Sequence, residues 1–351
     1  QFRTNLLSIW CILDYGKWLS FCIFVKDYTK VIFSTMFIAQ GFKKNNEFWK
    51  YLLGSLIVFI ASVVGQVPLL IAILINSIFS KSMPSKESDI YKLFDSNVLL
   101  FLILISFAFA IIGLYVVVIK LHRQSFISII TSRNKLDWKR VIFAFGIWAI
   151  FSISMIITSY IFEPSEIKLQ FNLVPFLILL LITLVLMPIQ TSTEELVFRG
   201  YLMQGFFNLA KNKWFPLLMT SLIFGIMHIA NPEVQKMGYL VLIYYIGTGL
   251  FLGIITLMDE GTELALGFHA ANNMIAALFI TSDYTVFKTY SVFKDTSEPS
   301  LDYEAFFPVF VIYPILIFIF SKIYKWKNWK EKLTGKLIID SKEIPFDDST
   351  L

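Results

Sequence analysis

The sequence is short of charge and of cysteine, and both shortages narrow the kinds of protein that it can encode. Charged residues are 16% of the 351 residues, 57% are hydrophobic, and the mean hydropathy is +0.70. A soluble domain carries roughly a quarter charged residues, so the composition excludes an ordinary soluble domain. The only cysteines are Cys11 and Cys22. The chain after them therefore has neither a disulfide framework nor a cysteine metal site.

The apolar residues form long segments without charge. The stretches LLGSLIVFIASVVGQVPLLIAILI and VLLFLILISFAFAIIGLYVVVI each exceed the ~20 residues that a helix needs to cross a hydrocarbon core about 30 Å thick. Strong apolar segments of this kind predict an all-α, polytopic transmembrane helix bundle of about eight spans. The segments are residues 52–79, 97–121, 141–162, 171–190, 214–231, 238–258, 262–281 and 306–324.

The net charge of +5 comes from basic residues gathered at the ends of these segments. The positive-inside rule describes this pattern for cytoplasmic loops, so a nucleic-acid partner is not expected. The clusters are Lys43, Lys44 and Lys50; Lys120, Arg123, Arg133, Lys135, Lys139 and Arg140; and the run 322–336. We expect a multi-pass protein of the cell membrane, in a bacterial inner membrane, with the lipid bilayer as its partner.

The number of times that residues 171–209 cross the membrane decides the topology. Pro188 separates an apolar run from TSTEELVFRGYLMQGFFNLA, which is either a kinked continuation or a second crossing. A single crossing places both the basic N-terminal lead and the basic C-terminal run on the cytoplasmic side. We therefore favour the single crossing and eight spans.

The segment TSTEELVFRG brings three ionisable residues, Glu194, Glu195 and Arg199, into an apolar region. Each costs about +2.5 to +3.5 kcal/mol at the centre of a span, which indicates a function. In a helix, Glu195 and Arg199 are i,i+4 neighbours that can form an ion pair. Glu194 points about 100° away, lacks that partner, and suits general acid–base chemistry. The hydroxyl residues 191–193 would cap the helix start; a capped helix with a solvent-facing glutamate pair is the alternative.

Histidine is also scarce, and two of the three histidines lie in apolar segments. His228 stands near the end of one span and His269 inside another, whereas His122 is predicted to be interfacial. His269 and Asn273 are i,i+4 neighbours, so both project from one helical face. Together they suit an oxyanion-stabilising or water-positioning pair. The neighbouring Asn272 points elsewhere and is the weaker candidate.

These residues support water activation by Glu194 with help from His228. A divalent metal such as zinc, held by Glu194, His228 and His269, is an open alternative, although the HExxH spacing is absent. We favour a metal-free mechanism that requires no cofactor. The small residues Gly249 and Gly253 predict close helix packing rather than chemistry.

Three motifs carry a resemblance to a known family. EELVFR (194–199) fits EExxxR, FGIMH (224–228) fits FxxxH, and HAANN (269–273) fits HxxxN. In order and spacing, the chain resembles the CPBP family of intramembrane proteases. That family comprises the type II CAAX prenyl endopeptidases and bacterial proteins linked to bacteriocin processing and self-immunity. The motif-bearing region covers roughly a third of the chain.

The resemblance implies an intramembrane endopeptidase that cleaves membrane-associated or prenyl-type peptide substrates. By motif position, Glu194 is implied to activate water, His228 to be its polar partner, and His269 with Asn273 to form the oxyanion hole. Glu195 and Arg199 are implied to support them. Two other functions stay open: a catalytically silent binding or immunity protein of the same fold, and a transporter, for which matching broken-helix halves are not found.

The chain is divided into four predicted parts. Residues 1–35 precede the first methionine, Met36, and are interpreted as an extension that is either native or translated upstream sequence. Residues 36–170 hold the N-terminal spans, and 171–281 form the catalytic transmembrane region. Residues 282–351 hold a polar loop, the last span and a solvated cytoplasmic tail.

Overall fold

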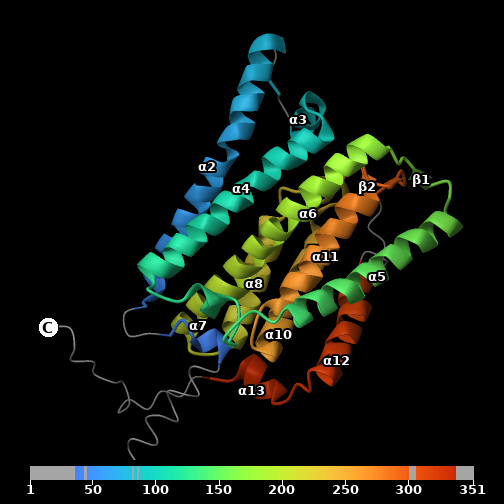
Figure 1. The fold of residues 1–351 in the computed structure, drawn as a ribbon. Coiled ribbons are helices and arrows are strands. Elements are labelled where there is room, and N and C mark those ends of the chain that lie inside the picture. Colours follow the sequence, from blue (N-terminus) through green and yellow to red (C-terminus); the bar gives the residue numbers. More distant parts are fainter. Residues whose placement is uncertain (1–35, 43–45, 81–82, 85–86, 300–305, 337–351) are drawn as a thin grey trace, which may run out of the picture.

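The computed structural model describes residues 36–42, 46–80, 83–84, 87–299 and 306–336, which form a bundle of helices (Figure 1). The long helices are α2 (Phe48–Ser80), α4 (Ser96–Val116), α5 (Trp138–Phe162), α6 (Leu173–Glu195), α10 (Leu242–Asp259) and α11 (Glu263–Phe279). The shorter ones are α3 (Glu87–Leu93), α7 (Met203–Ala210), α8 (Trp214–Met227), α9 (Pro232–Met237), α12 (Tyr313–Ile323) and α13 (Trp329–Thr334). The two cysteines and the prediction for 1–35 lie outside the described residues.

Five helical runs are long and apolar enough to cross a membrane, which confirms a multi-pass all-α membrane protein. They are Phe48–Phe79, Ser96–Leu121, Trp138–Phe162, Leu173–Ala210 and Tyr239–Asp259. The apolar helices Trp214–Met227 and Pro308–Ile323 are shorter. All eight predicted segments coincide with helices, and the count of eight spans stays a prediction.

Residues 173–210 form one continuous helical run, which favours the single crossing. Helix α6 passes through Pro188 and continues as a π-helical segment, η4 (Leu196–Leu202), into α7. The predicted helix start at 191–193 is therefore wrong. The hydroxyl groups of Thr191 and Thr193 instead donate to the carbonyl oxygens of Met187 and Ile189, one turn earlier, as threonines inside a helix do.

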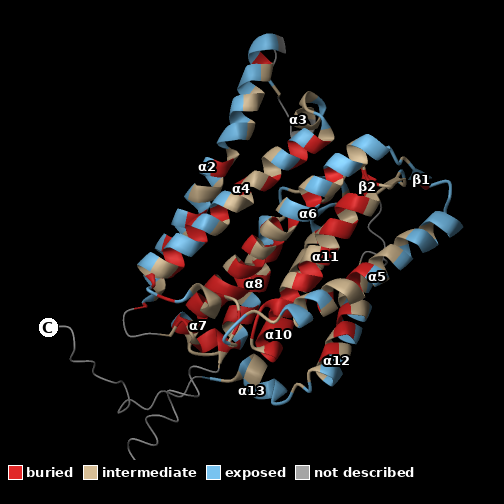
Figure 2. Ribbon diagram, in the orientation of Figure 1, coloured by how far each residue is buried: buried red, intermediate tan, exposed pale blue. Residues whose placement is uncertain are grey.

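The helices pack so that α11 lies at the centre. It contacts α5, α6 and α10, while α10 packs on α8 and α4 lies between α2 and α6. Buried residues line the facing sides of these helices, and most of α2 is exposed (Figure 2). The exposed side chains of α2 are apolar, including Phe59 and Ile60. Such a surface suits contact with lipid.

Glycines let α10 approach α8 closely, as predicted. A Cβ atom at Gly249 would lie 3.0 Å from the Cα atom of Ser221, and one at Gly253 would lie 2.5 Å from a methyl carbon of Leu217. The backbone of α10 can therefore come near α8 only because these positions lack side chains.

The segments 80–96 and 282–304, which lie between predicted spans, contain regular structure. Helix α3 lies within 80–96, and residues of 282–304 contribute to a three-stranded sheet of order β1-β3-β2. Strand β1 (Ile167–Leu169) pairs antiparallel with β3 (Phe293–Asp295), and β2 (Ile280–Ser282) pairs parallel with β3. Strands of three residues leave no periodic signal in the sequence, which explains why the sheet was not predicted.

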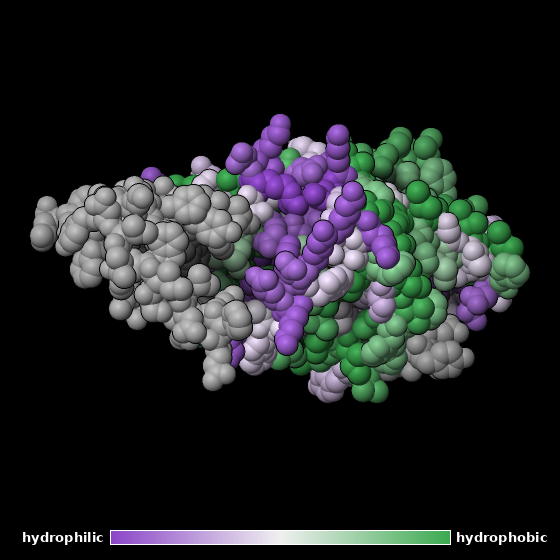
Figure 3. All heavy atoms as spheres, turned by 90° about the horizontal axis from the view of Figure 1, so that it is seen from below, coloured by the Kyte–Doolittle hydropathy of each residue, from purple (hydrophilic) through white to green (hydrophobic). Residues whose placement is uncertain are grey.

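Seen from below, hydrophilic side chains gather on one end of the bundle (Figure 3). The basic C-terminal run, predicted to be solvated, is partly anchored there. In α13, Lys332 lies 3.3 Å from a carboxylate oxygen of Glu260 and donates to the carbonyl of Met258 at 2.8 Å. His122, predicted to be interfacial, directly follows the run Ser96–Leu121. It is buried, and its Nε2 atom lies 2.8 Å from the hydroxyl of Tyr201.

Candidate active site

Two i,i+4 pairs face each other across the contact between α6 and α11. On α6 they are Gln190 and Glu194, and on α11 they are His269 and Asn273. The Nδ2 atom of Asn273 donates to Oε1 of Gln190 at 3.0 Å, and Nε2 of His269 lies 3.6 Å from Oε2 of Glu194. The order of the two contacts shows that the helices run antiparallel. The folded chain thus joins three residues predicted from sequence, Glu194, His269 and Asn273.

The second glutamate is held by a buried cation. Arg199 Nη1 donates to Oε1 of Glu195 at 3.0 Å, and both side chains are 0% exposed. This confirms the predicted ion pair. The other guanidinium nitrogen, Nη2, lies 3.3 Å from the carbonyl oxygen of Gly249, and the guanidinium stands 4.3 Å over the ring of Phe224. The arginine therefore connects α6 to α8 and α10, the role expected of a planar, delocalised cation.

His269 lies between the two glutamates. Its Nδ1 atom is 2.7 Å from Oε1 of Glu195, while its Nε2 atom faces Glu194. A carboxylate that accepts from one ring nitrogen fixes the orientation of the imidazole and the role of the other nitrogen. The sequence paired His269 only with Asn273. The additional contact with Glu195 depends on how α6 packs on α11, and the spacing of residues along the sequence does not predict this packing.

His228 contacts its own helix and a tyrosine of α10. It ends α8, and its Nδ1 atom hydrogen-bonds to the carbonyl of Phe224 at 2.7 Å. Its ring stacks on Tyr245 with centroids 4.2 Å apart. Within the described residues, no hydrogen bond or ion pair joins His228 to Glu194. Its role as a partner of Glu194 stays a prediction.

Sequence reasoning missed Gln190, although a signal for it existed. It lies four residues before Glu194, so a helix places both on one face. Its Nε2 atom donates to Oε1 of Glu194 at 2.6 Å, and it is buried. Asn272, the weaker candidate, donates to Oδ1 of Asn273 and accepts from the indole nitrogen of Trp148. Gln190 and Trp148 thus extend the predicted set.

Glu194, His228 and His269 are not gathered into a metal site in this arrangement. In the part of the chain that the structure describes, no three His, Cys, Asp or Glu side chains are grouped closely enough to hold a metal ion. The Nδ1 atoms of the two histidines contact Glu195 and the carbonyl of Phe224, so a metal would have to be bound by their Nε2 atoms. Whether the reaction proceeds without a metal stays a prediction.

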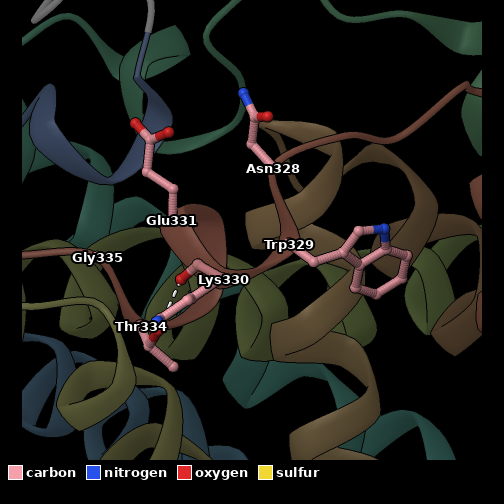
Figure 4. Close-up of a pocket in the computed structure, with 6 residues that line it drawn as sticks. All are labelled: Asn328, Trp329, Lys330, Glu331, Thr334 and Gly335. Atoms are coloured by element: carbon pink, nitrogen blue, oxygen red, sulfur yellow. Dashed lines mark hydrogen bonds between the residues drawn. The ribbon is translucent and has the colours of Figure 1, made fainter.

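A surface hollow lies away from these residues. It is lined by α13 and its ends, namely Asn328, Trp329, Lys330, Glu331, Thr334 and Gly335 (Figure 4). In it the hydroxyl of Thr334 donates to the carbonyl of Lys330 at 2.6 Å. The hollow contains no buried pair of ionisable groups and none of the residues of the site on α6 and α11, so we assign no chemistry to it.

The region that holds these residues matches a known protein family. Residues 171–275 match the family described as type II CAAX prenyl endopeptidase Rce1-like. The chain is 32% identical to the uncharacterized protein YyaK of Bacillus subtilis (strain 168) over 289 residues. The aligned residues cover 82% of this chain and 95% of YyaK. No solved structure matches. The resemblance inferred from the three motifs is confirmed: the chain belongs to the Rce1-like family of type II CAAX prenyl endopeptidases.

Proposed function

We propose that the protein is an intramembrane endopeptidase in which Glu194 activates water to hydrolyse a peptide bond. The position of Glu194 carries the proposal. One carboxylate oxygen accepts a hydrogen bond from Gln190 at 2.6 Å, the other faces His269 at 3.6 Å, and the side chain is 19% exposed. Among the described residues, no arginine or lysine forms an ion pair with it. The carboxylate is therefore oriented, partly exposed and not paired directly with a lysine or arginine.

In the proposed reaction, the carboxylate of Glu194 takes a proton from a water molecule, and the water oxygen attacks the scissile carbonyl carbon. The carbonyl π electrons move to oxygen and form a tetrahedral oxyanion. Glu194 then returns the proton to the amide nitrogen as the carbon–nitrogen bond breaks. The products are a carboxylic acid and an amine, which balances one water against one peptide bond.

Asn273 and His269 are the proposed stabilising groups for the oxyanion. The amide of Asn273 has two N–H groups, of which Gln190 occupies one. The other can donate to the oxyanion. His269 is held by Glu195, and its Nε2 atom is a second donor when the ring is protonated. Donors fixed in advance in a water-poor site contribute most to this kind of catalysis.

The proposed substrates are peptide segments of membrane-associated proteins, including prenylated ones. The family description names CAAX prenyl endopeptidases, and the two site helices lie within a bundle of apolar helices. A substrate anchored in the bilayer would reach a site in this setting more readily than a soluble protein would. A silent binding or immunity protein of the same fold is the competing function.

The proposal is tested with wild-type protein and Glu194→Gln in detergent. Two probes are used: an internally quenched peptide with a farnesylated cysteine three residues from its carboxyl end, and host-cell membranes whose new protein termini are mapped by mass spectrometry. We expect new termini with wild type and cleavage slower by about 10²- to 10⁴-fold with Glu194→Gln. Equal product patterns from the two proteins would overturn the proposal and favour the silent function.

A chelator arm of the same assay addresses the metal. Dialysis of wild-type protein against 1,10-phenanthroline is expected to leave the rate unchanged. A rate that falls and returns on addition of zinc would assign the reaction to a metal-dependent mechanism.

A further inference from the structure

A single chain of hydrogen bonds runs from Trp148 on α5 to the proposed catalytic carboxylate on α6. The indole nitrogen of Trp148 donates to Oδ1 of Asn272 at 3.1 Å, and Nδ2 of Asn272 donates to Oδ1 of Asn273 at 3.1 Å. Asn273 donates to Gln190 at 3.0 Å, and Gln190 donates to Glu194 at 2.6 Å. Three amide side chains therefore lie in series between an indole and a carboxylate.

The chemistry of the two ends fixes the direction of every bond. An indole N–H can only donate, and an ionised carboxylate can only accept. Asn272 must therefore turn its oxygen to Trp148 and its NH₂ group to Asn273. Each following amide inherits the same orientation. Reversing any one of them would place two donors or two acceptors in contact, which costs about 1–3 kcal/mol for each unsatisfied buried group.

The indole and the amide next to Glu194 are shielded from water. Trp148 is 5% exposed and Gln190 is 4% exposed, whereas Asn272 and Asn273 between them are half-buried. Trp148 also packs against the rings of Phe151, at 5.3 Å between centroids, and Phe268, at 4.4 Å. A buried indole that cannot rotate freely is a fixed donor. Hydrogen bonds in series within a region of low dielectric strengthen one another.

We propose that Trp148 is a remote positioning residue: through Asn272, Asn273 and Gln190, its indole N–H anchors the far end of the amide series that orients Glu194 and aligns the oxyanion-binding amide of Asn273. Neither Trp148 nor Gln190 belongs to the three sequence motifs. The inference rests on the proposed function, because its kinetic consequence requires Glu194 to be the water-activating group.

The chain makes a specific prediction for Trp148→Phe, which keeps an aromatic ring and removes the N–H group. Asn272 then loses its anchor on α5, and the amides are held in their orientation from the Glu194 end alone. We expect kcat on the farnesylated peptide to fall about threefold to tenfold with KM unchanged, the size of one neutral hydrogen bond. Gln190→Met, which has a similar shape and no donor, should lower kcat roughly 10- to 100-fold, because its lost bond ends on a charged group.

A matched control and a double variant separate positioning from packing. Phe151→Leu removes a ring contact of Trp148 without touching a hydrogen bond of the chain, and we expect its kcat to equal that of wild type. In the Gln190→Met background, Trp148→Phe should change kcat by less than about twofold, because the connection is already broken. Equal losses in Trp148→Phe and Phe151→Leu, or full additivity in the double variant, would overturn the inference.

A spectroscopic arm does not depend on activity. In ¹⁵N–¹H spectra of the full chain in detergent, the indole resonance that disappears in Trp148→Phe belongs to Trp148. Gln190→Met should shift this resonance, although two amides lie between the residues. An unshifted resonance would show that the series of hydrogen bonds between Trp148 and Gln190 does not exist. If the resonance shifts but Glu194→Gln still cleaves peptide, the series of hydrogen bonds is supported and the proposed function is wrong.

Discussion

The Nδ1 atom of His269 lies 2.7 Å from the same carboxylate oxygen of Glu195 that receives the guanidinium of Arg199 at 3.0 Å. One oxygen of a fully buried glutamate thus connects the proposed catalytic histidine to a buried cation. The remaining oxygen, Oε2, has no hydrogen-bond partner among the described residues. Glu195 is therefore a support for His269 and a counter-charge for Arg199 at the same time.

Glu195→Gln tests the counter-charge. The substitution keeps the shape of the side chain but leaves the buried guanidinium of Arg199 without its carboxylate. Breaking a buried pair in this way costs about 3–5 kcal/mol of folding free energy. We expect a clearly lower midpoint of thermal unfolding in detergent. The double variant Glu195→Gln/Arg199→Met should recover part of the loss, and a single variant as stable as wild type would contradict the ion pair.

The two histidines are expected to differ in their effect on the reaction. His269 lies 3.6 Å from Glu194, whereas His228 hydrogen-bonds to its own helix and stacks on Tyr245. His269→Gln should lower kcat by about 10²- to 10⁴-fold, the range for a residue that handles protons. His228→Gln should cost less. Cleavage of the farnesylated peptide by both variants measures the ratio, and a larger loss for His228→Gln would restore the role that the motif position implies.

A substitution at Gly267 should displace the helix that carries His269 and Asn273. A Cβ atom there would lie 2.1 Å from the carbonyl oxygen of Val141 on α5. Because this oxygen belongs to the backbone, it cannot easily move away. We expect Gly267→Ala to lower stability by about 1–3 kcal/mol and to reduce kcat. The matched control is Gly146→Ala on α5, where nothing lies within 4 Å. Thermal unfolding should show no loss there, and equal losses at both positions would contradict the close approach.

Lys213, between α7 and α8, gives a dependence on pH. Burial lowers the pKa of its ammonium group from 10.5, and the carboxylates of Glu260 and Glu331 partly offset this effect. The unfolded chain therefore binds the proton more tightly than the folded one. The resulting destabilisation is present at neutral pH and disappears as the pH rises through 10.5.

Lys213→Met should therefore raise the midpoint of thermal unfolding at pH 7 and have less effect near pH 10. The exposed Lys135 provides the control variant Lys135→Met, for which no such trend is expected. A lower midpoint for Lys213→Met at pH 7 would contradict the sign.

Local sequence patterns were sufficient to predict the features that involve residues close together on one helix. Charge-free segments predicted the helical bundle, and the i,i+4 spacing of Glu195 and Arg199 predicted their ion pair. The same spacing placed His269 and Asn273 on one face. Gln190 could have been found in this way, because it stands one turn before Glu194.

Contacts between helices could not be predicted from such patterns. The bond from Asn273 to Gln190 and that from Trp148 to Asn272 join residues 83 and 124 positions apart. They depend on the axial alignment of α11 with α6 and α5. The burial of His122 against Tyr201 could not be predicted for the same reason.

The small sheet at the far end of the bundle has a consequence for catalysis. Strand β1 ends shortly before α6 begins, and β2 follows α11 directly, while β3 pairs with both. Each of the two site helices is thus connected at one end to the same three-stranded sheet. Sliding α11 by one helical turn, about 5.4 Å, would break the pairing of β2 with β3 and separate both contacts between the helices. The sheet lies about 30 Å along α6 from Glu194, so residues far from the proposed catalytic groups help to set the alignment of these groups.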